Sequence, residues 1–304
     1  MIHIFIINTQ VVDSTFGDKL RAHLKERDDL EYFAFNTSHA GMEAEITKKM
    51  IRFFEGERIR FYSCGGSGTV RNIMEASGDY KDMEVAFFPC GATNDFLKVF
   101  GQREQHFHDI DNLIDGHVER IDYIRTNKGV ALNTVSFGID TTLSEALDGY
   151  QDYDIFGKKV PFFLSYAKSI IKAKPRKLHI KADDTIISKG ITEMIVGNGS
   201  VLGGGMHFTD HADYADGMAD YVMVADAGGV SVMKSIMKMV KNDIIGLRED
   251  TINGKAKVFE IKTDDGKPID FNLDGEIIRG ESEWKIEIVK QGMSFVMPKG
   301  IGIL

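Results

Sequence analysis

Hydrophobic positions in the first hundred residues follow two alternating patterns. Short runs rich in apolar and aromatic residues predict strands, and apolar residues spaced three or four apart predict helices between them. The runs are Ile2–Ile7, Leu30–Phe35, Arg58–Ser63 and Val85–Phe88, and the helical segments are Phe16–Arg27, Met42–Glu55, Thr69–Ala76 and Thr93–Phe100. Strands that alternate with helices form parallel sheets covered on both faces, so this part of the chain predicts an open α/β layer.

After about residue 115 the pattern changes to β-rich alternation. The expected strands are Val118–Thr126, Val130–Phe137, Lys177–Ala182, Thr185–Val196, Tyr221–Ala225, Lys257–Ile261 and Trp284–Val289, and the amphipathic stretches Pro161–Lys172 and Val230–Lys241 interrupt them. Successive strands without intervening helices predict an antiparallel sandwich or a barrel-like second domain. The change between residues 110 and 128 marks the expected domain boundary.

Composition agrees with two globular domains. The chain has 304 residues, and a prior of about 150 residues per domain gives two. Hydrophobic residues make up 43% and charged residues 27%, which excludes disorder, collagen-like structure and coiled coil. A balance of 37 basic against 46 acidic residues gives a net charge of −9, which argues against nucleic-acid binding and against anionic membranes except through a local patch.

Three further observations predict a cytoplasmic protein. Cys64 and Cys90 form no CxxC pair and, in a chain of this length, no disulfide framework. The opening run MIHIFIIN lacks the basic region of a signal peptide. No apolar stretch approaches the roughly 18–20 residues of a membrane span.

Two glycine-containing loops follow successive predicted strands. In the segment 63–69, SCGGSGT, the glycines let the backbone approach a ligand, and the helix behind them would direct N–H groups at a phosphate. It is neither a Walker loop nor a GxGxxG fingerprint, and a simple glycine turn stays open. In the segment 87–96, Thr93, Asn94 or Asp95 could simply cap a helix, without binding a ligand. Because both loops fall at the carboxyl ends of strands, the pair favours a nucleotide site.

Two later segments carry candidate acidic groups. The glycine-rich stretch 197–206 leads to Asp213, Asp216 and Met218, which could bind a hard cation or form a solvated acidic turn. His207 and His211 stand four residues apart, but without a nearby cysteine a zinc site is disfavoured. In the segment 272–276, NLDGE, Asp-Gly is a hairpin signal, and a role for Glu276 as a general base requires a nearby substrate hydroxyl that the sequence cannot show.

The order of these segments resembles the diacylglycerol kinase catalytic-domain family, in particular the soluble bacterial lipid kinases, which are related to sphingosine kinases and distantly to NAD kinases. The similarity covers nearly the whole chain, including Asn133, Gly138 and the segment Trp284–Pro298. It implies an α/β nucleotide-binding domain over residues 1–125, to which the last strand, about 290–304, returns. It also implies a β-sandwich lipid-substrate domain over 126–289, with the nucleotide in the cleft between the domains.

The resemblance also assigns expected roles to residues. The residues expected at the nucleotide are Asn8, Thr37, Gly65, Gly66, Ser67, Gly68, Thr69, Thr93 and Asn94. The expected catalytic residues are Asp95, Asp122 and Glu276, the last as general base, and Asp213, Asp216 and the Met218 carbonyl match a structural magnesium site. The implied reaction transfers phosphate from ATP to a lipid hydroxyl with Mg²⁺. The implied partner is a lipid at a membrane surface contacted transiently, and a homodimer stays open.

The sequence departs from the family pattern around the phosphates. Ser67 replaces the aspartate of GGDGT and cannot supply its negative charge. Arg71-Asn72 replaces Asn-Glu, the threonine of PxGTxNDF is displaced by one position, and the opening Asn-Pro is Asn8-Thr9. Two hypotheses follow: an active kinase for a diacylglycerol-, phosphatidylglycerol- or sphingoid-like acceptor, or an impaired homologue that binds nucleotide or lipid in a regulatory role. An NAD-kinase-like activity fits the late motifs less well.

Two amphipathic stretches bear on access to lipid. Pro161–Lys174 and Val230–Lys241 both combine apolar positions with flanking lysines. Such a helix can lie at a membrane interface, or it can pack on the β-domain with its lysines in water.

Overall fold

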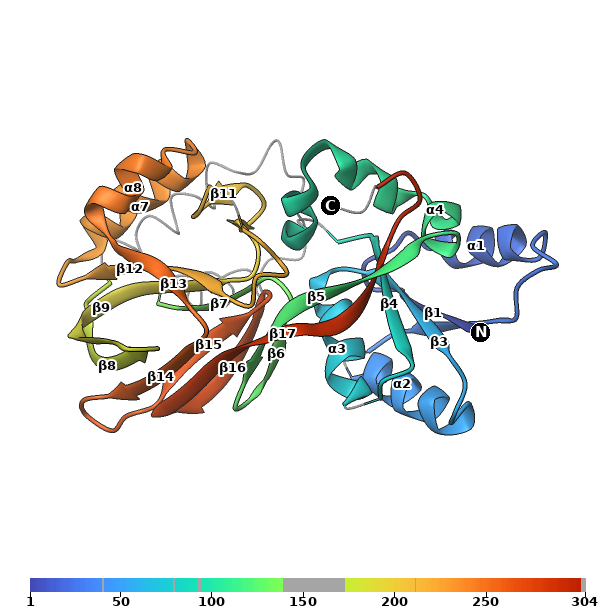
Figure 1. Ribbon diagram of the computed structural model, residues 1–304, viewed down its shortest axis with the longest axis horizontal. Coiled ribbons are helices and arrows are strands. Elements are labelled where there is room, and N and C mark those ends of the chain that lie inside the picture. The colour runs from blue at the N-terminus through green and yellow to red at the C-terminus, as the bar shows by residue number, and fades with distance from the viewer. Residues whose placement is uncertain (40, 79, 92–93, 139–172, 211, 302–304) are drawn as a thin grey trace. The chain divides into compact units, whose positions relative to one another are not determined.

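The computed structural model describes the chain except for residues 40, 79, 92–93, 139–172, 211 and 302–304 (Figure 1). The chain divides into two compact units, which we describe separately. Unit 1 comprises Met1–Asp122 and Gln291–Leu304, and unit 2 comprises Tyr123–Lys290. The chain therefore passes between the units twice, once along β5 (His117–Thr126) and once along β17 (Glu283–Met297).

Unit 1 contains a parallel sheet in the order β17–β4–β3–β1–β2. Its other strands are β1 Ile2–Asn8, β2 Tyr32–Thr37, β3 Ile59–Gly65 and β4 Met83–Pro89. All seven residues of β3 are buried, as expected of a central strand covered on both faces. The predicted α/β layer is confirmed, and each of its strands lies within a few residues of its expected position.

Helices cover both faces of this sheet. They are α1 Phe16–Leu24, α2 Met42–Phe53, α3 Ser67–Ser77 and α4 Ile110–Ile114. Figure 1 shows α2 and α3 on one face and α1 and α4 on the other. The segment after β4, expected to be an α-helix over Thr93–Phe100, is instead a 3₁₀ segment, η1, over Asp95–His108. Gly101 has a φ of 55°, and this left-handed backbone interrupts the helical hydrogen bonds at that point.

Aromatic rings fix η1 and the end of β17 to unit 1. Phe96 lies 6.1 Å from Phe100 and 5.8 Å from Phe295 between ring centroids, and Phe107 lies 6.0 Å from Phe295. Phe295 also pairs with Val85 across the parallel ladder of β17 and β4. The returning strand is therefore part of the hydrophobic core of unit 1.

Unit 2 is an antiparallel β-structure in the order β16–β15–β7–β9–β8–β14–β17, with β12 pairing β9 and β13, and β6 pairing β5. Its remaining strands are β6 Gly129–Ala131, β7 Thr134–Phe137, β8 Arg176–Ala182, β9 Thr185–Gly197, β10 Val201–Leu202, β11 Met206–His207, β12 Ala219–Ala225, β13 Ile252–Ala256, β14 Val258–Thr263, β15 Ile269–Leu273 and β16 Glu276–Glu281. The sandwich-type second domain expected from the sequence is confirmed.

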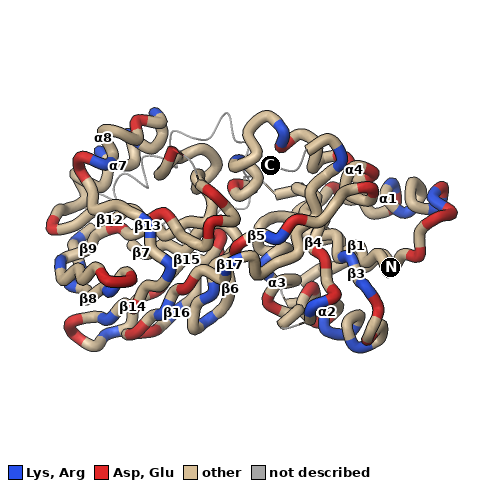
Figure 2. The backbone as a smooth tube through the Cα atoms, viewed as in Figure 1, with Lys and Arg blue, Asp and Glu red and all other residues tan. Residues whose placement is uncertain are grey.

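Two helices, α7 (Gly229–Val240) and α8 (Ile244–Asp250), pack on this sheet. The expected helix Val230–Lys241 is thus found, while the stretch Pro161–Lys172 lies outside the described residues. The single strand expected over Val130–Phe137 is two strands, because the backbone between them turns to bind a side chain described below. Among the described residues, no helix combines the length and apolar character needed to cross a membrane. Figure 2 shows acidic and basic residues interspersed along both units.

Candidate functional site

The loop between β3 and α3 has the geometry of a phosphate loop. Gly66 caps α3, and its carbonyl accepts hydrogen bonds from the N–H groups of Thr69 and Val70. A Cβ at Gly65 would overlap the Thr69 side chain, so glycine is needed there. The remaining N–H groups of the first turn, including that of Ser67, stand at the positive end of the helix dipole, where anions bind.

The loop after β4 meets this first loop directly. The Cys90 N–H donates to the Gly65 carbonyl at 2.8 Å. A Cβ at Gly91 would lie 2.7 Å from the Gly66 Cα and 2.9 Å from the Asn94 Oδ1 atom, closer than real Cβ contacts allow. Glycine therefore permits the two backbones to touch, and the predicted placement of both loops at one edge of the sheet is what the structure has.

Asn94 presents an acceptor beside this contact. Its backbone is left-handed, with φ 44°, and its Nδ2 donates to the Gly91 carbonyl at 2.8 Å. Its Oδ1 and the Ser63 Oγ are buried and have no hydrogen-bond partner among the described residues. Buried polar atoms are rarely left this way in the absence of a ligand or water, so both atoms indicate a binding site. Asp95 follows and is buried, whereas Thr93 lies outside the described residues.

The ends of β1 and β2 add a second row of polar groups. The Asn8 Nδ2 donates to the Thr69 Oγ1 at 3.1 Å, which ties β1 to the start of α3. The Thr37 hydroxyl donates to the Glu43 carboxylate at 2.8 Å, and Asn72 lies 3.5 Å from the other Glu43 oxygen. Glu43 was not identified from the sequence. The one signal for it is an acidic residue on the buried face of α2.

Cys64 lies near the end of β3 and Cys90 directly follows β4, and both are buried or half-buried thiols. Burial raises the pKa of the Cys64 thiol well above its usual value. Burial, with the nearby Asp13 charge, raises the pKa of Cys90 to about 12. Burial therefore favours the protonated thiol over the thiolate at both positions.

Asp122, the second predicted catalytic residue of unit 1, is fully buried. Its Oδ1 accepts the Gln291 N–H at 2.6 Å, where Gln291 has a left-handed φ of 47°. Arg120 donates to the Gln291 carbonyl at 2.8 Å. Asp122 thus holds the point at which the chain re-enters unit 1, in addition to any role it has toward a ligand.

In unit 2, Asp274 organises the turn that carries Glu276. The Asp274 carboxylate accepts backbone N–H groups of Leu132, Asn133 and Thr134 at 2.5, 3.0 and 2.8 Å. These contacts separate β6 from β7. Glu276 is exposed at the start of β16, directly after this turn. The hydrogen bonds of the Asp274 carboxylate to backbone N–H groups are charge-assisted and therefore strong, so they hold the hairpin in one position.

Asparagine side chains complete the arrangement around the same turn. The Asn133 Nδ2 donates to the Val201 carbonyl at 2.9 Å, and the Asn198 Nδ2 donates to the Leu132 carbonyl at 3.0 Å. The Asn272 Oδ1 accepts the Gly275 N–H at 2.6 Å. Residues that are far apart in the chain therefore hold this turn. None of these contacts was predicted from the sequence.

The acidic turn predicted to hold magnesium has a different occupant. The Asp216 Oδ1 accepts the Met218 N–H at 2.8 Å, and its Oδ2 lies 2.9 Å from the Lys255 Nζ. Asp213 is exposed, and its Oδ1 accepts the Ala215 N–H. An ammonium group therefore neutralises Asp216 in this structure, and the magnesium site at this turn stays a prediction.

The sequence also offered the pair His207 and His211 as a disfavoured metal candidate. Within the described ranges, no three His, Cys, Asp or Glu side chains gather in a way that could hold a metal ion. His207 lies on β11, and His211 lies outside the described residues, so the disfavoured zinc pair has no described geometry.

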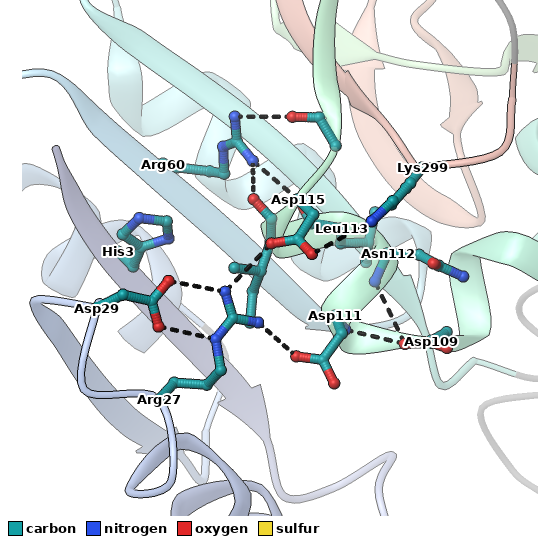
Figure 3. Close-up of polar contacts among 12 residues, drawn as sticks. His3, Arg27, Asp29, Arg60, Asp109, Asp111, Asn112, Leu113, Asp115 and Lys299 are labelled. Atoms are coloured by element: carbon teal, nitrogen blue, oxygen red, sulfur yellow. Dashed lines mark hydrogen bonds and ion pairs between the residues drawn. The ribbon is translucent and has the colours of Figure 1, made fainter.

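A second polar cluster lies at the opposite, amino-terminal ends of the unit 1 strands. Arg27 binds Asp29, Asp111 and Asp115 at 2.9, 2.8 and 3.1 Å, and Lys299 approaches Asp115 at 3.9 Å (Figure 3). Each of the three aspartates has a cationic partner within 4 Å, so we interpret this cluster as structural.

Buried Arg60 connects this end of the sheet to α4. Its Nε donates to the Glu84 carboxylate at 2.7 Å, and its Nη1 donates to the carbonyls of both Leu113 and Ile114, at 2.9 and 2.8 Å. Arg60 thereby satisfies carbonyls at the end of α4 that have no partner within the helix.

Comparison with known proteins covers both units. Residues 4–126 match the family described as the diacylglycerol kinase catalytic domain, and residues 133–296 match the YegS C-terminal NAD kinase beta sandwich-like domain. A Staphylococcus epidermidis protein named "Putative lipid kinase" is 28% identical over 80% of this chain and 75% of its own length. A protein from Staphylococcus aureus strain MSSA476, which is also named as a putative lipid kinase, is 26% identical over 77% of this chain and 76% of its own length.

Solved structures share the fold at lower identity. A structure described as a "putative diacylglycerol kinase" from Bacillus anthracis str. Sterne has a TM-score of 0.73 at 20% identity, covering 98% of both chains. Another Bacillus anthracis diacylglycerol kinase structure has a TM-score of 0.69 at 18% identity. One of the two family matches spans more than half of the chain, and the two matches follow each other in the same order as the two units. This protein therefore belongs to the diacylglycerol kinase catalytic-domain family, with a YegS-type C-terminal domain.

Proposed function

We propose that this protein is an ATP-dependent lipid kinase that transfers the γ-phosphoryl group to the hydroxyl of a diacylglycerol-like lipid. The observation that carries the proposal is the direct contact of two glycine loops, at Gly66 and Gly91, where α3 begins. Glycine backbones and a helix start together form a cradle for phosphates. The lipid class of the acceptor comes from the names of the related kinases.

The donor side of the reaction uses the polar groups of unit 1. The ATP phosphates bind the N–H groups at the start of α3, around Ser67 and Gly68. The unpaired Oδ1 of Asn94 accepts a hydrogen bond from the nucleotide. Asn8 and Thr37, which terminate neighbouring strands, line the same edge of the sheet.

The chemical step is an in-line phosphoryl transfer. The bond between the γ-phosphorus and the oxygen shared with the β-phosphate breaks, ADP leaves with that electron pair, and a new bond forms to the lipid oxygen. Glu276 accepts the proton of the lipid hydroxyl. Asp95 and Asp122 are buried carboxylates of the type magnesium prefers and would hold the ion, which when bound neutralises phosphate charge.

Asp274 is a positioning residue in this proposal. By accepting three backbone N–H groups, it holds the turn from which Glu276 projects. Its carboxylate is committed to those donors, so it does not compete with Glu276 for the substrate proton.

A second candidate function is nucleotide or lipid binding without transfer. The observation that favours it is Ser67 in the first turn of α3, a neutral side chain where the family carries an aspartate. A Ser67→Asp variant separates the two candidates. A native kinase changes its rate modestly, whereas a large gain from an inert wild type supports the second candidate.

The experiment that tests the kinase proposal is transfer of radiolabelled phosphate from ATP to a panel of extracted lipids. Glu276→Ala is expected to lower the rate by about 100-fold or more, the usual contribution of a general base. Glu283→Ala is the matched control, since Glu283 is another exposed glutamate of unit 2. Undiminished transfer by Glu276→Ala rejects the assigned base, and no transfer to any lipid by the wild type rejects the kinase proposal.

A further inference from the structure

Helix α7 has apolar residues on two faces. On the inner face Val232, Ile236 and Met239 are buried against the sheet of unit 2. On the outer side Val230 and Val240 are 61% and 54% exposed. Packing against the sheet explains why the inner face is apolar. It does not explain the apolar residues on the outer face.

Lysines are interleaved with this outer apolar face. Val230, Lys234, Met237 and Lys241 recur at spacings of four, three and four residues, which places them in one line along the helix. Met237 is 38% exposed, and both lysines are exposed. Residues 229–241 contain no Asp or Glu.

The neighbouring helix extends the same surface. Ile245 of α8 is 75% exposed, and α8 packs beside α7. We call the six residues Val230, Lys234, Met237, Val240, Lys241 and Ile245 the outer patch.

Of the acidic residues that border the outer patch, Asp243 and Asp250 have partners, while Glu249, one turn after Ile245 on α8, is exposed. The Asp243 carboxylate accepts the Gly246 N–H and caps α8, and Asp250 binds Lys238 at 2.6 Å. No described carboxylate forms an ion pair with Lys234 or Lys241. The outer patch therefore combines exposed apolar side chains with two exposed lysines that form no ion pair among the described residues, although Lys234 interacts at longer range with Asp250.

We propose that the outer patch docks on an anionic lipid surface. The four apolar side chains enter the interfacial region, and Lys234 and Lys241 face the headgroup phosphates. This inference rests on the proposed function, because a lipid kinase must reach an acceptor that resides in a membrane. The protein carries a net charge of −9, so binding to an anionic bilayer requires a local patch of this kind.

A second copy of the chain is a poorer occupant of the outer patch. A two-fold dimer buries the same surface of both copies, so it would bring four lysines into one interface and offer them only Glu249 of each copy as an unpaired bordering carboxylate. An anionic bilayer instead supplies the opposite charge. The charge pattern therefore selects the lipid surface.

The test is co-sedimentation of the purified full chain, without ATP, with vesicles of phosphatidylcholine alone or mixed with phosphatidylglycerol. We expect binding to the mixed vesicles and little to phosphatidylcholine. The variant Lys234→Glu/Lys241→Glu is expected to lose at least fivefold in affinity per lysine, and Met237→Ser/Val240→Ser to bind weakly to both. Matched controls are Lys267→Glu and Ile186→Ser, exposed residues of unit 2 outside the outer patch.

Several results would overturn the proposal. One is equal binding of the wild type and both outer-patch variants to the mixed vesicles, and another is no vesicle binding by the wild type. A third is light scattering that shows a dimer dissociated by Met237→Ser/Val240→Ser, which assigns the outer patch to a second copy. Transfer to a soluble short-chain acceptor is measured in parallel: vesicle binding without transfer rejects only the proposed function, and transfer without binding rejects only the docking.

Discussion

The two ends of the parallel sheet in unit 1 use polar residues in opposite ways. At the amino ends, His3, Arg60 and Glu84 lie beside one another on β1, β3 and β4, and each charged group has a side-chain or carbonyl partner. At the carboxyl ends, the Asn94 Oδ1 and Ser63 Oγ are buried without a partner among the described residues. One end of the sheet satisfies its polar groups internally, while the other leaves acceptors for a ligand.

This difference separates stability from function within one sheet. Changes at the amino ends should lower the free energy of unfolding and leave transfer intact in the molecules that remain folded. Changes at the carboxyl-end loops should lower transfer with little effect on unfolding. The following predictions test that separation, from the largest expected effect to the smallest.

Removing the buried partner of Arg60 should have the largest effect. Glu84→Ala leaves the Arg60 guanidinium buried without its carboxylate, and breaking such a pair typically costs about 3–5 kcal/mol. Denaturant unfolding measures the loss. Asp18→Ala, which removes an exposed carboxylate 3.7 Å from Arg21, is the control and should change stability by less than about 1 kcal/mol. Equal losses in the two variants would contradict a structural role for the amino-end cluster.

Gly91→Ala should lower phosphoryl transfer by about 100-fold, because the added Cβ forces apart the loops at Gly66 and Gly91 by roughly an ångström. Steady-state kinetics with ATP measures the change, and thermal unfolding should shift far less than for Glu84→Ala. Gly228→Ala is the control, since a Cβ there meets nothing within 4 Å. Normal kinetics in Gly91→Ala would show that the loop contact is not needed for the site.

Asp274→Asn should lower kcat by about tenfold while KM for ATP stays unchanged. The substitution removes the negative charge that three backbone N–H groups share, and Glu276 loses its fixed position. Asp183→Asn is a close control, because the Asp183 carboxylate accepts the Lys257 and Val258 N–H groups at 2.9 Å in another turn. Both variants should lose similar stability, and a similar loss of kcat in both would reject the positioning role.

The last prediction concerns pH, and its effect is the smallest of the four near neutral pH. Burial, with the nearby Arg60 charge, lowers the pKa of His3 from 6.5 to about 4. Between these values the unfolded chain binds a proton that the folded chain does not, so His3 makes stability fall as pH falls, by at most about 1.4 kcal/mol per pH unit. Above pH 6.5 His3 contributes no pH dependence. His3→Gln should flatten the stability curve between pH 6.5 and 4, and parallel curves for wild type and variant would exclude this contribution.

The sequence predicted the elements of the fold well where hydrophobic periodicity was regular. The strands β1, β3 and β9 were found because long apolar runs or alternation mark them. The segment η1 was misjudged as an α-helix, because apolar spacing over so few residues does not separate an α-helix from a 3₁₀-helix. Short polar strands such as β13, with the sequence INGKA, carry too little pattern to be recognised.

The loops that form the candidate site could be predicted from the sequence, but the side-chain contacts within it could not. The glycine segments identified where the backbone approaches a ligand, and neighbouring strands bring those segments together. The partners of Asp274 lie 140 or more residues earlier in the chain, and no local rule connects them. For the same reason Lys255, which neutralises Asp216, could not be foreseen from the acidic turn alone.

The return of β17 to unit 1 has a consequence for how the protein is made. The ribosome must deliver residues 291–297 before Phe295 can close the aromatic core with Phe96 and Phe107. Unit 2, Tyr123–Lys290, is continuous and can complete its sheet first, although it is encoded later than most of unit 1. A fragment cut at residue 126, where the first family match ends, would expose that core. Truncations for expression should therefore keep the final strand or supply it as a separate segment.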